Sequence, residues 1–480
     1  MQSKNAGHRI GDEDRLPFSA WLKKPILIGQ HAARLVSGHG GIANCARKAY
    51  RIYRLHGLKA AYMRLKNAVK GISMHVQSVA SGDTHAKNQE YVAFITDRNR
   101  VEASSDFVPL TAELHDFSRI TTKLIAFYLP QFHAIPLNDE WFGKGFTEWI
   151  NVTKAIPQYT GHYQPQLPID LGYYDLKDIA VMKRQVELAK LYGLHGFCFH
   201  YYWFSGTRLM EMPIRNWLDH RELDFPFCLN WANENWAKLW GGGDKEVRYK
   251  QELNDGDDER FFEDILPFFK DTRYITVQGK PVFIVYRPHL FTRARCLAFT
   301  NSMRKLAVAH SFPGLFMIAA NSYDFQDDPA SWGLDAMLEF PPHGMLKRGM
   351  RQKQMHCFVN PHFHGQVWDG ADYVVERRFL YETNYTLFKG VFPSWDNTPR
   401  KAYSGSIVID GVNPALYKQW LADCINYTRT CHEKDQQFIF INAWNEWAEG
   451  AHLEPDSRYG YAYLQATRDA LLARGEKHMQ

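Results

Sequence analysis

The chain has 480 residues, 45% of them hydrophobic and 15% aromatic, with a net charge of +5. This length is too great for one average domain but suits one large barrel with an appendage, and the apolar content supplies a substantial core. The sequence excludes a zinc site of ordinary Cys/His spacing, a signal peptide and a membrane span, and its seven scattered cysteines fit a reducing compartment.

The first predicted element is a basic helical arm, residues 1–72. Residues 1–70 hold 14 Lys or Arg and 3 acidic residues, a local charge of +11, which leaves −6 for the rest of the chain. Residues 46–70 repeat apolar side chains at roughly helical spacing among the basic ones. This pattern is typical of contact with a membrane surface or acidic partner, and equally of a solvated arm packed on its own domain. Nucleic acid is not an expected partner, because the aromatic-rich remainder is net acidic.

Residues 73–120 have mixed composition and predict a linker or a loosely structured extension. We expect the whole protein to be cytoplasmic, with peripheral contact at the inner membrane face as the alternative that the basic arm leaves open.

From Lys123 onward, short apolar runs alternate with longer amphipathic stretches such as DLKDIAVMKRQVELAKLYG (175–193). Only DFQDDPASWGLD separates the fifth run from the sixth, which is too short for a full helix. The pattern predicts a (β/α)8 barrel with insertions over residues 121–480. A doubly wound open sheet is the alternative, but no GxGxxG follows any predicted strand. The eight predicted strands are residues 124–130, 196–204, 226–233, 281–288, 316–323, 336–342, 389–395 and 438–444.

Aromatic and polar residues gather where the predicted strands end, which is where (β/α)8 barrels carry their chemistry. Aromatic rings stack on the faces of sugars, and Asn, Glu and His bind hydroxyl groups. Any single aromatic residue belongs to the core more often than it stacks on a sugar. The same mixture of aromatic and polar residues at five strand ends, however, favours a carbohydrate site. The candidate substrate-binding residues are His133, Glu148, Trp149, Tyr201, Tyr202, Trp231, Asn233, Glu234, Asn235, Trp236, Trp395, Trp444 and Asn445.

The stretch NAWNEWAEG (442–450), after the apolar run FIFI, places Glu446 and Glu449 three positions apart. Such positions face opposite sides of a strand, but in a helical turn their Cβ atoms lie about 5–6 Å apart. Retaining glycosidases need carboxyl groups about 5–5.5 Å apart, so this pair is catalytic only if the backbone curls directly after the strand. Repulsion would then raise one pKa. In the alternative, one glutamate caps the turn and the other pairs with an arginine of a neighbouring loop.

The motifs LIAFYLPQFH, EWFGKGFTEW, GHYQPQLPIDLGYYDL, GFCFHYYWFSGTRLME, FPFCLNWANENW, GKPVFIVYRP and NAWNEWAEGAHLEPD together resemble the WbsX-like family, related to glycoside hydrolase family 99. The resemblance covers residues 123–463 and implies a (β/α)8 barrel. It also implies that Glu446 assists the substrate's 2-hydroxyl as that group attacks the anomeric carbon. Glu449 then acts as general acid and afterwards as base for water. Ala448 stands where family 99 often has His.

The resemblance leaves hydrolysis and transfer open, because WbsX-like proteins are commonly encoded with bacterial surface polysaccharide genes and are often labelled glycosyltransferases. The sequence has no recognisable donor-binding or DxD metal motif, and DGDD (255–258) precedes a predicted helix as an N-cap cluster would. We expect a retaining, endo-acting hydrolase-like enzyme that cleaves an O-antigen type of polysaccharide without metal or cofactor. The alternatives are a glycosyltransferase of lipopolysaccharide biosynthesis and a non-catalytic carbohydrate-binding barrel, which the presence of both glutamates disfavours.

Overall fold

The computed structural model describes residues 103–473, apart from residues 112, 238–246, 324, 355–359, 361, 402 and 403, together with four residues between 89 and 96. The predicted basic arm and most of the predicted linker lie outside the described residues, so both stay predictions.

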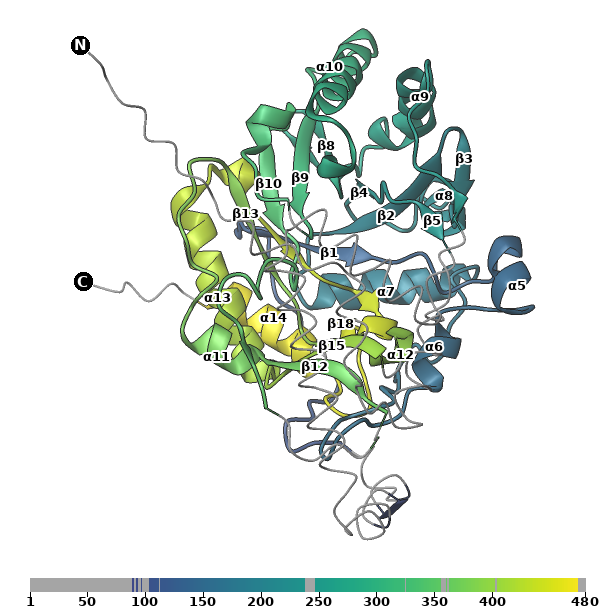
Figure 1. Cartoon of the computed structure of the whole chain (residues 1–480). Helices are drawn as coiled ribbons and strands as arrows, with labels where there is room; N and C mark the ends of the chain where they lie inside the picture. Colours follow the sequence, from purple (N-terminus) through teal and green to yellow (C-terminus); the bar gives the residue numbers. More distant parts are fainter. Residues whose placement is uncertain are drawn as a thin grey trace, which may run out of the picture. The chain divides into compact units, whose positions relative to one another are not determined.

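Within the described residues, eight parallel strands close into a barrel (Figure 1). The circle closes because the first strand pairs with both the second and the last, in register Ile125 to Gly196 and Ile125 to Phe440. All eight predicted strands are present, and the predicted (β/α)8 fold is confirmed. In order around the barrel they are β1 (Lys123–Tyr128), β2 (Gly196–Phe204), β4 (Phe227–Trp231), β8 (Lys280–Val285), β9 (Phe316–Asn321), β10 (Ala336–Glu339), β13 (Leu387–Val391) and β16 (Phe438–Ile441).

Three of the main helices that cover the barrel begin at a side-chain cap. Asp178 accepts a hydrogen bond from the backbone N–H of Ala180 at the start of α7, and Thr292 and Asn413 cap α10 and α13 in the same way. No helix of the described part is long and apolar enough to cross a membrane. The main helices are α7 (Ile179–Leu191), α8 (Met212–Asp219), α9 (Asp257–Phe269), α10 (Arg293–Ala309), α13 (Pro414–Cys431) and α14 (Ala462–Leu472).

As predicted, no full helix fits between the fifth and sixth barrel strands. That connection holds only the 3-10 turn η4 (Pro329–Trp332). The shorter elements elsewhere are α5 (Pro136–Phe142), α6 (Trp149–Thr153), α11 (Gly370–Val375), α12 (Thr398–Lys401), β3 (Thr207–Leu209), β5 (Trp236–Ala237), β6 (Val247–Tyr249), β7 (Thr276–Val277), η3 (Pro288–Leu290) and η5 (Lys434–Gln436).

A second, four-stranded sheet was not predicted from the sequence. Its order is β11 (Arg351–Gln352), β12 (His364–Asp369), β15 (Ser404–Asp410) and β14 (Trp395–Asp396). Strands β14 and β15 pair antiparallel, Trp395 opposite Ile409. Because β14 directly follows barrel strand β13, this sheet lies beside the carboxyl end of the barrel (Figure 1).

The described end of the predicted linker, residues 103–120, holds no helix and only an isolated β-bridge, from Val108 to Gly460. The Val108 N–H donates to the Tyr459 carbonyl (3.1 Å), and its own carbonyl accepts from the Tyr461 N–H (2.8 Å). This segment is therefore attached to the barrel rather than free of it.

Candidate active site

The chain curls immediately after β16, as a catalytic glutamate pair requires. Strands β17 (Asn445–Glu446) and β18 (Ala451–His452) form a hairpin, and the 3-10 turn η6 (Trp447–Glu449) joins them. Glu446 ends β17 as the N-cap of this turn, Glu449 is the last residue of η6, and the side chains of both reach the same arginine. Gly450 ends the turn with φ 62°, a conformation that favours glycine.

Both glutamates converge on Arg400 of α12. Its Nη2 atom lies 2.6 Å from the nearer oxygen of Glu446, and its Nη1 atom lies 2.9 Å from that of Glu449. A third carboxylate, that of Glu148, lies 3.1 Å from Nη2. The Glu449 side chain is the most exposed of the three, at 20%, against 7% for Glu446 and 2% for Glu148.

The two glutamates therefore converge, as predicted for a catalytic pair. They also pair with an arginine, as expected in the alternative that gives them a structural role. Arg400 comes from the segment after the seventh barrel strand, a neighbouring loop in the sense of that alternative. However, one arginine contacts three carboxylates here, whereas a simple structural ion pair joins one cation to one anion. Sequence reasoning did not identify Arg400, and the only signal was its place shortly after the predicted strand end PSWDN.

The cluster holds an excess of negative charge, with one consequence for protonation. Burial raises the pKa of Glu446 well above the ordinary carboxyl value; Arg400 opposes this rise, and Glu449 and Glu148 add to it. One pKa of the pair was expected to rise, and the raised group is Glu446. The resemblance, by contrast, assigns the general acid role to Glu449.

A buried network behind the turn was missed by sequence reasoning. The Glu454 carboxylate accepts hydrogen bonds from Trp447 Nε1 (2.6 Å), Gln185 Nε2 (2.7 Å) and the Tyr174 hydroxyl (2.9 Å). Because Trp447 stands between the two glutamates in the chain, Glu454 fixes the turn that carries them. Burial raises the pKa of Glu454 to about 7. Its signal in the sequence was an acidic residue directly after the motif, in GAHLEPD.

The variant Glu454→Gln tests this network through the pH dependence of stability. The folded-state pKa of Glu454, about 7, is raised above the ordinary carboxyl value of 4.5, so the wild-type carboxyl contributes stability below pH 4.5 that is lost as the pH rises through 7. The neutral amide has no such dependence. We expect the free energy of unfolding of the wild type, relative to the variant, to fall by about 2–3 kcal/mol between pH 5 and 8. Urea unfolding followed by tryptophan fluorescence measures it, and a difference independent of pH would contradict the assignment.

Two of the predicted substrate-binding aromatic residues lie with the glutamates. Burial raises the pKa of Tyr202, and the charges of Glu446 and Glu234 add to the rise. Trp236 packs edge-on against Tyr202, with ring centroids 5.3 Å apart. Glu234 itself pairs with Arg287.

Two further tyrosines near the glutamates were not predicted to belong to the site. Burial raises the pKa of Tyr323 to about 12, and the charges of Glu234 and Glu449 contribute. The same two carboxylates raise the pKa of Tyr286, after burial as the main cause. The guanidinium of Arg287 lies 3.9 Å from the centroid of the Tyr323 ring. The sequence signal for Tyr286 was the motif VYRP, at the end of the fourth barrel strand.

Three predicted substrate-binding aromatic residues instead belong to the protein core. Tyr201 donates a hydrogen bond to Asp264 of α9, and Trp231 packs on Phe261 of that helix. Successive residues of a strand face opposite sides, so Tyr201 points to the helices when Tyr202 points inward. Trp444 is fully buried, 5.0 Å from the Phe197 ring.

Three of the asparagines predicted to bind substrate instead form hydrogen bonds to the backbone of loops. Asn233 bonds to both backbone groups of Arg287 (2.7 and 2.9 Å), and Asn445 does the same at Leu129 (2.7 and 3.0 Å). The Asn235 side chain accepts from the backbone N–H of Gln251, just after β6 (2.7 Å).

Two further predicted residues flank the site without joining the glutamate cluster. Trp149 stacks near Trp447 (5.5 Å between centroids) and donates to the Tyr174 carbonyl (2.8 Å). Burial lowers the pKa of His133, and its charged neighbours are Asp175, Lys177 and Glu211 rather than the glutamate pair.

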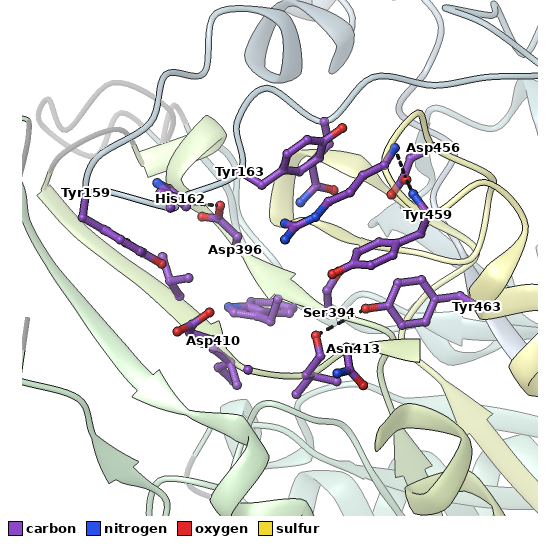
Figure 2. A pocket seen from close by; sticks show the side chains of 18 residues that line it. Tyr159, His162, Tyr163, Ser394, Asp396, Asp410, Asn413, Asp456, Tyr459 and Tyr463 are labelled. Carbon is purple, nitrogen blue, oxygen red and sulfur yellow. Dashed lines mark hydrogen bonds and ion pairs between the residues drawn. The ribbon is translucent and has the colours of Figure 1, made fainter. Parts of the chain in front are cut away.

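Trp395, the last predicted binding residue, lines a cavity of about 220 Å³ beside the turn (Figure 2). Glu446 and Glu449 are not among its lining residues. Asp396 lies in the wall, held by His162 Nε2 at 2.7 Å. A second cavity, of about 680 Å³, is lined by residues that precede β10, β13 and β16, at the opposite end of the barrel.

No group of three or more metal-ligating side chains is found in the described part of the chain. The DGDD stretch lies at the start of α9, but the N-cap of this helix is Gly256 without a side-chain cap hydrogen bond, and Asp257 and Asp258 belong to the first turn. The Asp257 carboxylate accepts from the Asn254 N–H (2.7 Å), and Asp258 pairs with Arg295 (2.5 Å).

Comparison with known proteins adds a family match. The family model described as "Glycosyltransferase WbsX" matches residues 124–467. Two curated relatives, both described as "Uncharacterized protein WxcX", come from Xanthomonas campestris pv. campestris, strains B100 and ATCC 33913. Each is 42% identical over 357 residues, which cover 73% of this chain and 50% of the relative. The chain thus spans about half the length of the curated relatives it matches.

Solved structures with similar folds include the GH99 endo-alpha-mannosidase from Bacteroides thetaiotaomicron, at 15% identity and a TM-score of 0.46 over 72% of this chain and 96% of that one. A "glycoside hydrolase-like protein" aligns at 14% identity and a TM-score of 0.46, over 77% of this chain and 99% of that one.

Proposed function

Since the chain belongs to the WbsX glycosyltransferase family of carbohydrate-active enzymes, we propose that it cleaves glycosidic bonds of a bacterial surface polysaccharide of the O-antigen type. The reaction takes place at the turn η6, with Glu446 and Glu449 as the catalytic pair. Hydrolysis with retention of configuration is the proposed outcome.

The observation that carries this proposal is the cluster of three glutamates around one arginine. A buried carboxylate without a matched cation is costly, and Arg400 matches only one of the three charges. A fold stabilised by ion pairs alone has no need of the other two. A buried carboxyl group with a raised pKa, such as that of Glu446, is typical of a site that moves protons.

In the proposed first step, ionised Glu446 takes the proton of the substrate's 2-hydroxyl, and that oxygen bonds to the anomeric carbon. The glycosidic C–O bond breaks, and Glu449 gives its proton to the leaving oxygen. The product on the enzyme is a 1,2-anhydro sugar. The raised pKa of Glu446 makes its ionised form a stronger proton acceptor than an ordinary carboxylate. The route requires O2 trans to the leaving group, as in an α-mannoside.

In the proposed second step, water attacks the anomeric carbon while Glu449 takes the water's proton. The bond from the anomeric carbon to O2 breaks, and O2 recovers its proton from Glu446. Both carboxyl groups return to their starting state, and two inversions give net retention. Arg400 stabilises whichever of the two is ionised at each stage, since it contacts both.

Transfer to a sugar acceptor is the second candidate, and the description of the matching family favours it. An acceptor hydroxyl would replace water in the second step, or a nucleotide sugar would replace the glycan as donor. The predicted basic arm, residues 1–72, would then hold the protein near a lipid-linked acceptor at the inner membrane face.

One experiment separates the two candidates. The full-length protein is incubated with isolated O-antigen polysaccharide and, separately, with nucleotide sugars plus a lipid-linked acceptor. Shortened glycan with new reducing ends supports hydrolysis, and nucleotide release that depends on acceptor supports transfer. Binding without turnover in either mixture would contradict both and support a carbohydrate-binding barrel.

A further inference from the structure

We infer that the cavity beside the turn is a second sugar subsite, which holds a neutral pyranose unit of the glycan outside the unit that reacts. This inference rests on the proposed function, since it takes the same glycan as the ligand. The cavity of about 220 Å³ is smaller than pockets for drug-sized ligands, about 300–1,000 Å³. Its size therefore suits a single ring.

The cavity shares a wall with the catalytic turn. Ser394, which lines it, donates a hydrogen bond to the carbonyl of Gly450, the residue after Glu449. A side chain placed on Gly450 would lie 3.0 Å from Gln166 Nε2 and 3.1 Å from the Asp396 backbone nitrogen, both in the lining. Gly450, which ends the catalytic turn, thus packs directly against the wall of the cavity.

Aromatic rings border the space on opposite sides. In Figure 2, Tyr159 stands on one side, and Tyr459 and Tyr463 stand on the other. Tyr159 is held in place by stacking on His162, with centroids 4.4 Å apart and planes 9° apart. Preset tyrosine faces are suited to the C–H faces of a pyranose ring, which has an apolar body and a polar rim.

Two hydrogen-bond donors in the lining lack a partner within the described residues. Trp395 is 6% exposed, and its buried indole Nε1–H has no acceptor there. Arg458 lies 4.7 Å from the Tyr163 ring and 4.9 Å from the Tyr459 ring, and its guanidinium forms no ion pair with any described carboxylate. The Trp395 Nε1 atom is closed to solvent, whereas Arg458 is half-buried, so its guanidinium is the donor that a ligand hydroxyl in the cavity can reach.

The charged residues that line the cavity favour a neutral sugar ring over an acidic one. Asp396, Asp410 and Asp456 all line the cavity with Arg458. Asp410 pairs with Lys353 at 2.8 Å yet keeps an exposed carboxylate that can accept from a hydroxyl group. An acidic sugar would find one free guanidinium among three aspartates. A neutral sugar uses both the donors and the acceptors.

The test measures sugar binding by saturation-transfer NMR on the full-length protein, with D-mannose, D-glucose, D-galactose and D-glucuronate at millimolar concentrations as probes. Two variants address the cavity: Arg458→Ala removes the donor, and Val412→Phe narrows the space from its wall. Arg215→Ala, on an exposed position of α8, is the matched control. Circular dichroism and Tm confirm that each variant folds.

We expect at least one neutral sugar to bind to the Glu446→Gln/Glu449→Gln double variant, which leaves the cavity intact. Adding either cavity substitution to it should weaken that signal at least about fivefold, roughly 1 kcal/mol, whereas Arg215→Ala should not. Equal binding by cavity variants and control, no neutral sugar bound, or glucuronate alone bound would overturn the inference. The outcome is independent of turnover: if the glutamate variants remain active while the cavity binds sugar, the proposed function fails and the subsite stands.

Discussion

Glu449→Gln is expected to lower the rate of glycosidic-bond cleavage by about 100- to 10,000-fold, the usual contribution of a general acid–base group. The amide has nearly the shape of the carboxyl group but can neither give a proton to the leaving oxygen nor take one from water. Initial rates of reducing-end release from O-antigen polysaccharide measure the effect. Stability should change little, because the Glu449 side chain is 20% exposed and Arg400 keeps its other two carboxylates.

Substrates with different leaving groups distinguish a loss of acid catalysis from a loss of substrate binding. A glycoside with an acidic phenol as leaving group needs no proton, so the first step should be largely restored in Glu449→Gln but not in Glu446→Gln. Glu187→Gln, on an exposed position of α7 that pairs only with Arg184 among the described residues, is the control and should keep full activity. Full activity in both Glu446→Gln and Glu449→Gln would remove the site assignment.

The fold was predictable because its signal is local. Each barrel strand is a short apolar run that both faces bury. The curl after FIFIN, by contrast, was only a condition for Glu446 and Glu449 to act as a catalytic pair. The second sheet gave no comparable signal, since strands such as HGQVWD (364–369) are polar and half exposed. Their pairing depends on β15, about 40 residues later in the chain.

The site residues were predictable only in part, for a geometrical reason. A strand buried on both faces carries no alternation of polar and apolar residues, so nothing in HYYWF tells that Tyr202 faces the glutamates while Tyr201 faces α9. Arg400 was beyond reach for a different reason. Its partnership with Glu446 spans 46 positions of sequence, and such contacts leave no pattern in a single chain.

Arg400→Met is expected to destabilise the protein by about 3–5 kcal/mol at pH 8, because removing one member of a buried ion pair leaves uncompensated charge. Arg400 is 12% exposed and contacts three carboxylates. Its charge lowers the pKa of Glu446, so without it that pKa rises further. A carboxyl whose folded-state pKa is raised gives stability that is complete below pH 4.5 and is lost as the pH rises through the raised value. The penalty should therefore shrink at pH 5, where Glu446 takes up a proton.

Urea unfolding of Arg400→Met and wild type at pH 5 and pH 8 measures this effect. Arg377→Met is the control, because Arg377 is 47% exposed and pairs with Asp423 at 3.0 Å. An ion pair whose cation is open to solvent, although Asp423 itself is 14% exposed, is expected to contribute only about 0–1 kcal/mol, and its loss should depend little on pH over this range. If Arg400→Met costs no more than Arg377→Met, or costs the same at both pH values, then the three carboxylates are not held ionised by Arg400. The excess negative charge that carries the proposed chemistry would then not exist in the folded protein.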